Sequence, residues 1–376
     1  MTAPGSEGLS IIVPAFGRAR LLDALLASLS VACASFASPS EVLVLDNTPD
    51  ERAGRIREIT ASHGAAYYRG SDNVSEKRNQ GVELAQHDLV LFLDSDCTVD
   101  PGLLAHHHDT LLATGAAGCL GLLRFAGQES ATWRAVATLS VLDCFSFPEQ
   151  FEDVSWGPTA NISFRREWLR RVGGFSTAFA RPGGEDVDLG FRIVDAGGRI
   201  ACDRQAIAHH STSTWLTFGK VARRFFAYGA GDVLLIRRHP HRSVVDAPTP
   251  THVFALVVVL TVAAYFASGN AAVAIGPVVW LFVTTAVYVL ASATRERRRP
   301  LMQAITTYVL RLYLLAALDA GRLVHAVLGR VPTALWRRVV FYDGQAAADW
   351  PDITASMIAS LAGLAVTLLL LLSLAA

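Results

Sequence analysis

The chain has 376 residues, of which 52% are hydrophobic and 18% are charged. This composition is too apolar for an ordinary soluble enzyme. The 33 basic and 33 acidic residues give a net charge of zero, which favours neither nucleic acid nor a highly charged protein as a partner. Long uncharged runs begin near Val253, so we expect a water-soluble N-terminal part and a membrane-associated C-terminal part.

The cysteines and the N-terminus both indicate a reducing compartment. The five cysteines are scattered without a Cys-x-x-Cys pair, which is typical of neither a disulfide framework nor a zinc site. Residues 1–8 are polar and lack the apolar core of a signal peptide. We therefore expect the N-terminal domain to stay in the cytoplasm.

Hydrophobic runs alternate with helical patterns over the first hundred residues. We expect strands at residues 9–14, 41–46 and 65–68 and at the run that ends at Leu93, and helices near residues 18–29, from Pro49, and at residues 75–86. Such strict alternation with short connections predicts an α/β fold with right-handed crossovers and a mostly parallel sheet.

Two of these strands end in carboxylates. Asp46 closes the second strand, and the fourth runs directly into Asp94 and Asp96. Ligands of open α/β sheets bind outside the carboxyl ends of the strands. Mg²⁺ or Mn²⁺ is commonly held there by one or two carboxylates together with substrate phosphates. The pair is therefore a candidate metal site, although an isolated Asp-x-Asp is more often only an acidic turn.

A helix is expected from Pro101, and it contains His106, His107 and His108. Consecutive helical residues point about 100° apart, so the three imidazoles cannot face one ion. We expect them on a solvated or partly packed face. Further on, residues 115–125 and 156–164 are expected to be strands and residues 130–142 a helix.

An acidic block follows Gly183 and Gly184. These glycines allow positive φ angles, and the helix after them begins with Glu185, Asp186 and Asp188 in its first turn. Helix capping is one explanation, but adjacent carboxylates cannot all cap, so one is expected to face the crevice. Short strands at residues 199–202 and 206–209 lead to His209-His210, and one of these imidazoles could complete a metal site begun by Asp94 and Asp96.

In this order and spacing, the residues resemble an inverting, nucleotide-sugar-dependent glycosyltransferase of family 2. The resemblance spans about Leu9 to Pro240, and it is carried by His209 and by the segments 12–16, 45–48, 77–81, 94–96, 159–165, 173–175 and 184–192. It implies the A-type glycosyltransferase fold, in which a Rossmann-like, mostly parallel sheet carries a nucleotide-binding half followed by an acceptor-binding half.

The resemblance also implies a donor site. It places Asp46 on the nucleobase, Pro14 and Phe16 at the base pocket, and Arg78 near the base or the diphosphate. Many members have a second aspartate after the first, whereas this chain has Asn47, so contacts to the base or ribose are expected to differ.

The same resemblance places ribose, diphosphate and metal on Asp94 and Asp96, with His209 as a further metal ligand. The catalytic base corresponds to the Glu185-Asp186 pair, and Asp186 fits the family's usual position better. Single displacement at an anomeric carbon needs such a base for the acceptor hydroxyl, and a cation to offset charge on the leaving diphosphate.

Two further polar residues have a structural alternative. Arg192 is expected to be a structural partner of the acidic block rather than a substrate contact. Asn161 is expected either to hydrogen-bond the donor or acceptor sugar or to stabilise a turn.

An amphipathic segment is predicted at residues 213–250. Its apolar residues fall on one helical stripe, whereas Lys220, Arg223 and Arg224 lie on the other side. This pattern favours an interfacial helix whose bases meet lipid phosphates or reach back to the donor diphosphate. A helix packed on the catalytic domain is the alternative. Gly229 and Gly231 predict a break in it.

Residues 251–376 are predicted to form a membrane domain. Spans are expected at about 252–268, 271–293 and 353–375, and the basic cluster at 295–299 is expected on the cytoplasmic side. Residues 301–328 carry polar groups on one side of the helical wheel, so an interfacial or re-entrant helix is favoured over a lipid-exposed span.

Together these features predict a multi-pass protein of the cell (inner or plasma) membrane with residues 1–212 as its cytoplasmic catalytic domain. It would use Mg²⁺ or Mn²⁺ to move a sugar from a UDP-, GDP- or dTDP-sugar to a hydroxyl or phosphate, for which membrane anchoring suggests a lipid-linked acceptor. No oligomeric state is indicated. The alternatives are a processive polysaccharide synthase and a catalytically inactive, nucleotide-sugar-binding scaffold. The intact set of Asp94, Asp96, Asp186 and His209 argues against the inactive scaffold.

Overall fold

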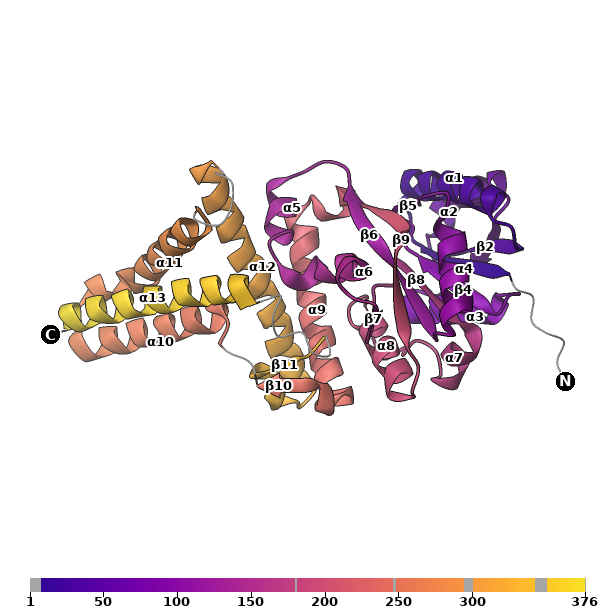
Figure 1. Cartoon of the computed structure of the whole chain (residues 1–376). Helices are drawn as coiled ribbons and strands as arrows, with labels where there is room; N and C mark the ends of the chain where they lie inside the picture. Colours follow the sequence, from indigo (N-terminus) through magenta and orange to yellow (C-terminus); the bar gives the residue numbers. More distant parts are fainter. Residues whose placement is uncertain (1–7, 180, 246–247, 294–299, 342–349, 376) are drawn as a thin grey trace. The chain divides into compact units, whose positions relative to one another are not determined.

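The computed structural model describes residues 8–179, 181–245, 248–293, 300–341 and 350–375. Within these residues the chain divides into two units (Figure 1). The first unit contains residues 8–128, 141–214 and 340–341, and the second contains the other described residues. Each unit is described by itself.

A nine-stranded sheet forms the frame of the first unit, in the order β3-β2-β1-β4-β8-β6-β9-β5, with β7 paired to β9 (Figure 1). The strands are β1 (Leu9–Ala15), β2 (Ser40–Asp46), β3 (Ala66–Arg69), β4 (Leu89–Leu93), β5 (Cys97–Val99), β6 (Gly118–Ala126), β7 (Asp153–Val154), β8 (Asn161–Arg165) and β9 (Ile200–Ser211). The α/β class and the parallel arrangement of β3, β2, β1 and β4 are confirmed.

Beyond β4 the sheet is mixed. Strand β8 runs antiparallel to both β4 and β6, β6 and β9 are parallel, and β5 and β7 are antiparallel to β9. β8 therefore lies between the parallel strands β3, β2, β1 and β4 and the group formed by β6, β9, β5 and β7. The strand β4 and the two strands that flank the acidic block in sequence, β8 and β9, accordingly belong to one continuous sheet.

Helices cover both faces of this sheet. They are α1 (Ala19–Ser35), α2 (Asp50–Ser62), α3 (Val74–Leu84), α4 (Leu103–Thr114), α6 (Phe147–Gln150), α7 (Arg166–Arg171) and α8 (Glu185–Asp195). Side chains alternate along β1, so Leu9, Ile11 and Val13 pack with leucines of α1 and α4 in one core. Ile12 points to the other face, against α3. Each such fully buried aliphatic side chain stabilises the fold by roughly 1.5–3 kcal/mol.

Three expected elements differ in extent. The expected strands at 199–202 and 206–209 form the single strand β9, whose pairing with β6 changes register between Gly121 and Leu122. The expected helix at 130–142 is α5 (Ala131–Val136), followed by a 3₁₀ helix at Ser140–Ser146. The expected strand at 156–164 begins only at Asn161, because Pro158 has no N–H to donate to a ladder.

The second unit contains α5 and the long helices α9 (Phe218–Arg238), α10 (Pro250–Ser268), α11 (Gly276–Ala293), α12 (Leu301–Leu328) and α13 (Trp350–Ala375). A short two-stranded antiparallel sheet pairs β10 (Ser243–Val245) with β11 (Arg337–Val339). Helices α10, α11 and α13 lie side by side (Figure 1). Among the described residues beyond 211, 3₁₀ helices lie at Thr212–Trp215, Pro240–Arg242, Ala271–Ile275 and Pro332–Leu335.

In the described part of the chain, four helices are long and apolar enough to cross a membrane by length and composition: 250–268, 271–291, 301–328 and 357–375. The sequence predicted three spans, and the additional candidate is α12, which was expected to be interfacial or re-entrant. The basic cluster predicted at residues 295–299 lies outside the described residues.

Two glycines bring α9 and α12 into close contact. A Cβ atom on Gly229 would collide with the backbone oxygen of Leu318, and one on Gly321 would collide with that of Phe226. Helix α9 runs unbroken from Phe218 to Arg238, so the predicted break at Gly229 and Gly231 is wrong. Gly229 is required by the crossing rather than by a turn.

The polar side of α12 faces other helices of its unit. Arg322 donates to Oδ2 of Asp232 on α9 through Nη2 (2.7 Å) and Nε (3.0 Å), and Arg311 donates to the backbone oxygen of Thr138. Thr249 donates to Oδ2 of Asp319 at 2.7 Å. The exposed residues of the helix up to Leu328 are all uncharged: Leu301, Met302, Thr306, Tyr313, Ala320, Leu323, Val324, Val327 and Leu328. Charges inside and apolar residues outside are the reverse of a water-exposed helix.

Gly321→Leu is expected to disrupt the α9–α12 crossing, because its side chain would occupy the space of the Phe226 backbone. Overpacking of this kind costs about 1–3 kcal/mol. We expect a lower midpoint of thermal unfolding in detergent. Ala320→Leu is the matched control, since Ala320 lies one residue away on the exposed face, and it should leave the midpoint unchanged. Equal midpoints for the two variants would contradict the close crossing.

Candidate active site

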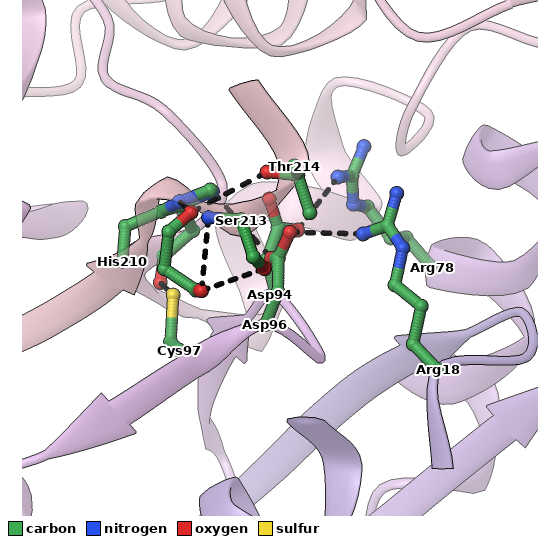
Figure 2. A network of polar contacts seen from close by, with 10 residues as sticks. Arg18, Arg78, Asp94, Asp96, Cys97, His210, Ser213 and Thr214 are labelled. Carbon is green, nitrogen blue, oxygen red and sulfur yellow. Dashed lines mark hydrogen bonds and ion pairs between the residues drawn. The ribbon is translucent and has the colours of Figure 1, made fainter. Parts of the chain in front are cut away.

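The carboxylate pair lies in the turn between β4 and β5. The amide of Cys97 donates to the backbone oxygen of Asp94 at 3.1 Å, which closes the turn and carries Asp96 into the sheet edge. The side chain of Asp96 is only 4% exposed, whereas that of Asp94 is 36% exposed. Figure 2 shows both carboxylates together with Arg18, Arg78, Cys97 and His210.

A buried guanidinium joins this pair to the acidic block. Arg78, on α3, donates to Oε1 of Glu185 at 2.8 Å and lies 3.6 Å from Oδ1 of Asp94. Its guanidinium carbon also lies 5.4 Å from the centroid of the Phe175 ring. Arg78 is 4% exposed. Arg78, which was predicted to lie near the base or the diphosphate, therefore pairs with two carboxylates in the structure.

Two carboxylates of the acidic block, those of Glu185 and Asp188, form ion pairs with arginines. Gly184, with φ 102°, precedes the helix α8 and lets the chain turn there. Glu185 accepts from Arg78 and from the amide of Gly183 at 2.7 Å. Asp188, fully buried, pairs with Arg192 at 2.9 Å.

Arg192 further donates to the backbone oxygens of Val172 and Gly174. The prediction that Arg192 is a structural partner of the block is confirmed.

Asp186 is the half-buried carboxylate of the block. Its Oδ1 accepts from the amide of Val187 at 2.9 Å. Desolvation, followed by the negative charge of Glu185, raises the pKa of Asp186 to about 7, and Arg78 opposes this shift. A carboxyl group with this pKa can take a proton near neutral pH, which is what a general base requires.

The two histidines at the end of β9 lie beside different aspartates. Adjacent strand residues point to opposite faces, so only one imidazole can reach the carboxylate pair. Nε2 of His210 lies 3.5 Å from Oδ1 of Asp96, and its side chain is 5% exposed. Nε2 of His209 lies instead 3.0 Å from Oδ1 of Asp100. The structure thus places His210, not His209, beside Asp96.

The donor set around Asp96 fits a divalent cation. Asp96, Cys97 and His210 offer ligand atoms that all lie within 4.8 Å of one another. Burial raises the pKa of the Cys97 thiol well above its usual range, so this sulfur stays protonated and is a poor ligand. The carboxylates and the imidazole remain, a set that suits Mn²⁺ or Mg²⁺.

A polar loop follows β2 at the same edge of the sheet. Asp46 is fully buried and accepts from the amide (3.0 Å) and the hydroxyl (2.5 Å) of Thr48 and from the Tyr67 hydroxyl (3.2 Å). Nearby, Phe16 is 56% exposed and Pro14 is half-buried at the end of β1. The buried carboxylate fixes the loop, and the exposed ring offers a surface at its side.

Asn47 connects two charged groups that the sequence reasoning missed. It accepts from Nζ of Lys77 at 2.6 Å and donates to Oδ1 of Asp72 at 2.8 Å. Burial lowers the pKa of Lys77 to about 8. Asp72 thus brings a carboxylate next to the position where the resemblance led us to expect a second aspartate. Nothing in the local sequence pattern pairs residue 72 with residue 47.

Asn161 does not reach the site. It is fully buried, its amide nitrogen donates to the oxygens of Leu122 (3.1 Å) and Ala206 (2.8 Å), and its oxygen lies 2.9 Å from Nε2 of His107. The side chain is therefore engaged by the sheet and by His107 of α4, and the expected contact with a sugar stays a prediction. A turn does precede β8, but the backbone amide of Asn161 closes it by donating to the oxygen of Pro158 at 3.3 Å.

His107 is also fully buried, with Nδ1 2.9 Å from the Ser163 hydroxyl. Desolvation lowers the pKa of His107 to about 4, so it is neutral. The expectation of a solvated or partly packed face is wrong for this residue, because α4 packs it against the sheet.

Arg223 and Arg224 lie on α9 in the second unit. Arg223 is exposed, and the guanidinium carbon of Arg224 lies 4.1 Å from the centroid of the Trp215 ring. Their contact with a diphosphate stays a prediction.

Comparison with known proteins gives two family matches. Residues 10–173 match the model described as glycosyl transferase family 2, and residues 150–212 match that described as the N-terminal domain of galactosyltransferase. The first match contains β1 to α7, including both carboxylates of the turn after β4, and the second contains α8 and β9.

Several curated proteins are similar over the same part of the chain. The pre-mycofactocin glycosyltransferase of Mycobacterium tuberculosis is 29% identical over 255 residues, covering 64% of this chain and 50% of the relative. The chondroitin synthase of Escherichia coli is 25% identical over 239 residues, covering 54% and 34%. The validoxylamine A glucosyltransferase of Streptomyces hygroscopicus subsp. jinggangensis is 25% identical over 228 residues, covering 53% and 54%. The chain thus spans about half the length, or less, of these relatives.

Among solved structures, the mannosyltransferase PcManGT from Pyrobaculum calidifontis in complex with GDP-Man and Mn²⁺ covers 98% of this chain and 88% of its own. The identity is 15% and the TM-score 0.45, a likeness too distant to carry an argument.

Proposed function

From the premise that this chain carries a glycosyltransferase family 2 domain, we propose that it moves a sugar from a nucleotide-sugar donor to an acceptor by single displacement with inversion. One observation carries the proposal. Asp186, a half-buried carboxylate with a pKa of about 7, lies next to Glu185, and Arg78 links Glu185 directly to Asp94. The proposed base and the proposed metal-binding turn are thereby linked through Arg78.

The residues divide the chemistry between them. Asp94, Asp96 and His210 would hold a divalent ion, which supplies positive charge against the leaving diphosphate. Asp186 takes the proton from the acceptor hydroxyl as its oxygen bonds to the anomeric carbon and the bond to the diphosphate breaks. The attack and the departure occur on opposite faces of the sugar, so the configuration is inverted. Glu185, held by Arg78, positions α8 and does not take the proton.

Phe16, Pro14 and the loop of Asp46 form the proposed base pocket. The exposed ring of Phe16 would stack on the base, and the polar chain of Asp72, Asn47 and Lys77 would meet its edge or the ribose. A UDP-, GDP- or dTDP-sugar is the proposed donor class.

The second unit is proposed to hold the enzyme at the cell membrane, with the catalytic domain (residues 1–212) cytoplasmic, an interfacial segment at residues 213–250 and a membrane domain at residues 251–376. Helix α9 carries Lys220, Arg223, Arg237 and Arg238, too many charges for a span, and it packs along α12. We therefore place α12 in the interface, with its apolar face in the lipid. This placement favours an acceptor that is itself lipid-linked.

The test uses the full chain in detergent or lipid nanodiscs with a panel of UDP-, GDP- and dTDP-sugars and Mn²⁺. We expect release of the nucleoside diphosphate from one donor, with loss of the release on adding a chelator and recovery on adding excess Mn²⁺ or Mg²⁺. Absence of release from every donor, with glycan and lipid-phosphate acceptors present, would count against the function.

His210→Ala is expected to weaken Mn²⁺ binding at least about tenfold, whereas His209→Ala leaves it unchanged. The two histidines are adjacent on β9, but only His210 faces Asp96. Titration of free Mn²⁺ by electron paramagnetic resonance, in the presence of the accepted nucleoside diphosphate, measures both variants. The opposite order would return the metal role to His209.

A processive polysaccharide synthase is the second candidate. The relatives named chondroitin synthase of Escherichia coli and hyaluronan synthase of Pasteurella multocida favour it. Product length on a gel distinguishes the two, since single transfer extends each acceptor by one sugar and a synthase yields a ladder or a long polymer.

A further inference from the structure

We propose that Arg18 binds the donor diphosphate, and that it forms an ion pair with Asp96 as long as no divalent ion is bound to that carboxylate. The proposal rests on the proposed function of the site. Nη1 of Arg18 lies 2.8 Å from Oδ2 of Asp96, a contact between residues that are 78 positions apart in the sequence. The bond therefore reaches from the loop after β1 to the turn after β4.

The backbone at Arg18 has an unusual conformation. Arg18 has φ 56° and ψ 40°, in the left-handed region, and Gly17 before it has φ 59°. In the described part of the chain, Arg330 is the other non-glycine residue with positive φ. L residues are strained in this region, and such strain persists where the surroundings impose it, often at ligand-binding loops.

Contacts on both sides of Arg18 impose this conformation. The amide of Gly17 donates to the hydroxyl of Thr48 at 2.6 Å, and Thr48 in turn holds Asp46. On the other side, the amides of Leu21 and Leu22 donate to the backbone oxygen of Arg18 as α1 begins. The loop is thus fixed between the proposed base pocket and the helix, and it directs the arginine side chain toward Asp96.

Arg18 and a divalent ion compete for one carboxylate. Asp96 already faces Arg18 through Oδ2 and His210 through Oδ1, and its side chain is 4% exposed. An ion held between Asp96 and His210 would bring two positive charges against the guanidinium within a few ångströms. Because like charges repel strongly at such distances, Arg18 would leave Asp96 when an ion is bound there.

The displaced guanidinium has a negative partner close by. The diphosphate of a bound donor would lie beside that ion, and an arginine pairs with phosphate oxygens through two parallel N–H groups. The side chain of Arg18 is 45% exposed and flexible enough to follow. Arg78 is not an alternative, since it is 5% exposed and lies against both Asp94 and Glu185.

The experiment compares Arg18→Gln, Arg18→Lys and the control Arg20→Gln in the purified full chain. Arg20 lies two residues further on α1 and is exposed. Mn²⁺ alone should bind Arg18→Gln more tightly than the wild type, by about threefold or more, because the competing charge is gone. With Mn²⁺ present, the accepted nucleoside diphosphate should bind Arg18→Gln about 10- to 100-fold more weakly by calorimetry, because charge-assisted hydrogen bonds are lost.

Arg18→Lys keeps the charge but not the paired donors, so it should leave Mn²⁺ binding near the wild-type value and restore only part of the diphosphate affinity. Arg20→Gln should change neither. If Arg18→Gln leaves both affinities unchanged, or weakens both, Arg18 only shapes the loop and the proposal is wrong. A wild type that binds no nucleoside diphosphate with Mn²⁺ would instead overturn the proposed function itself.

Discussion

Asp186→Asn is expected to lower the rate of sugar transfer about 10²- to 10⁴-fold while leaving the affinity for the donor unchanged, because the amide has the shape of the carboxylate but cannot take a proton. Asp186 is half-buried, and its hydrogen bond from the amide of Val187 can be kept by the amide oxygen of asparagine. Single-turnover rates and calorimetric titration with the nucleoside diphosphate separate the two effects. Asp50→Asn is the control, since Asp50 is also in the first turn of a helix but its side chain is 77% exposed.

The rate of the wild type should follow the ionisation of Asp186. With a pKa of about 7, the carboxylate is mostly protonated at pH 6 and mostly ionised at pH 8. We therefore expect the rate to rise about tenfold per pH unit well below pH 7 and to level off above it. Asp186→Asn should remove this dependence. A flat profile for the wild type would contradict the assignment.

The raised pKa of Asp186 also makes the stability of the fold depend on pH. The pKa of Asp186 rises from 3.8 in the unfolded chain to about 7 in the fold, so the folded state holds a proton that the unfolded state has lost. Stability contributed by this group is complete below pH 3.8 and is lost as the pH rises toward 7. Asp186→Asn should therefore gain thermal stability relative to the wild type between pH 5 and pH 8, which also shows that the variant is folded.

Asp186→Asn distinguishes acceptor classes as well. A hydroxyl must lose a proton as it attacks, whereas a phosphate oxygen is already ionised at neutral pH and needs no base. The full loss of rate is expected only for hydroxyl acceptors.

Asp96→Ala is expected to reduce nucleotide release about 10²- to 10³-fold, the effect of losing a cation that offsets charge on a leaving group. It should also make the remaining activity insensitive to chelator. Asp96 is the carboxylate that faces both His210 and Arg18, so its removal deprives an ion of its central ligand.

Asp100→Ala is the matched control, because Asp100 also pairs with a histidine of β9, but with His209, and its side chain is 44% exposed. Loss of the partly exposed Asp100–His209 pair should cost only about 0–1 kcal/mol. Asp96 is buried beside His210, so the midpoint of thermal unfolding of Asp96→Ala must show that this variant is folded. Equal loss of nucleotide release in the two variants, or an Asp96→Ala protein that still responds to chelator, would contradict the assignment of the metal to Asp96.

Local patterns were sufficient for the first half of the sheet. Alternation of apolar runs and helical repeats gave the parallel strands, and the direction of parallel strands puts Asp46 and Asp94 at one edge. The Gly183-Gly184 turn and the helix at Glu185 followed from residue types in the same way.

Other features depend on partners far away in the sequence. The choice between His209 and His210 depends on the register of a strand that carries a bulge against β6, and a shift of one residue exchanges the faces. Asn161 is buried because His107 of α4 meets it in the folded sheet. Gly229 permits a turn or a close crossing, and the second follows only from Gly321 some ninety residues later.

The guanidinium of Arg78 has a consequence for how this fold can be recombined. It belongs to residues 10–173, which match the glycosyl transferase family 2 model, whereas its 2.8 Å partner, Glu185, belongs to residues 150–212, which match the second model. A chimaera that joins the first stretch of one relative to the second stretch of another must therefore preserve this ion pair across the junction. The two matched stretches are not separate modules in this chain, because this buried ion pair joins them.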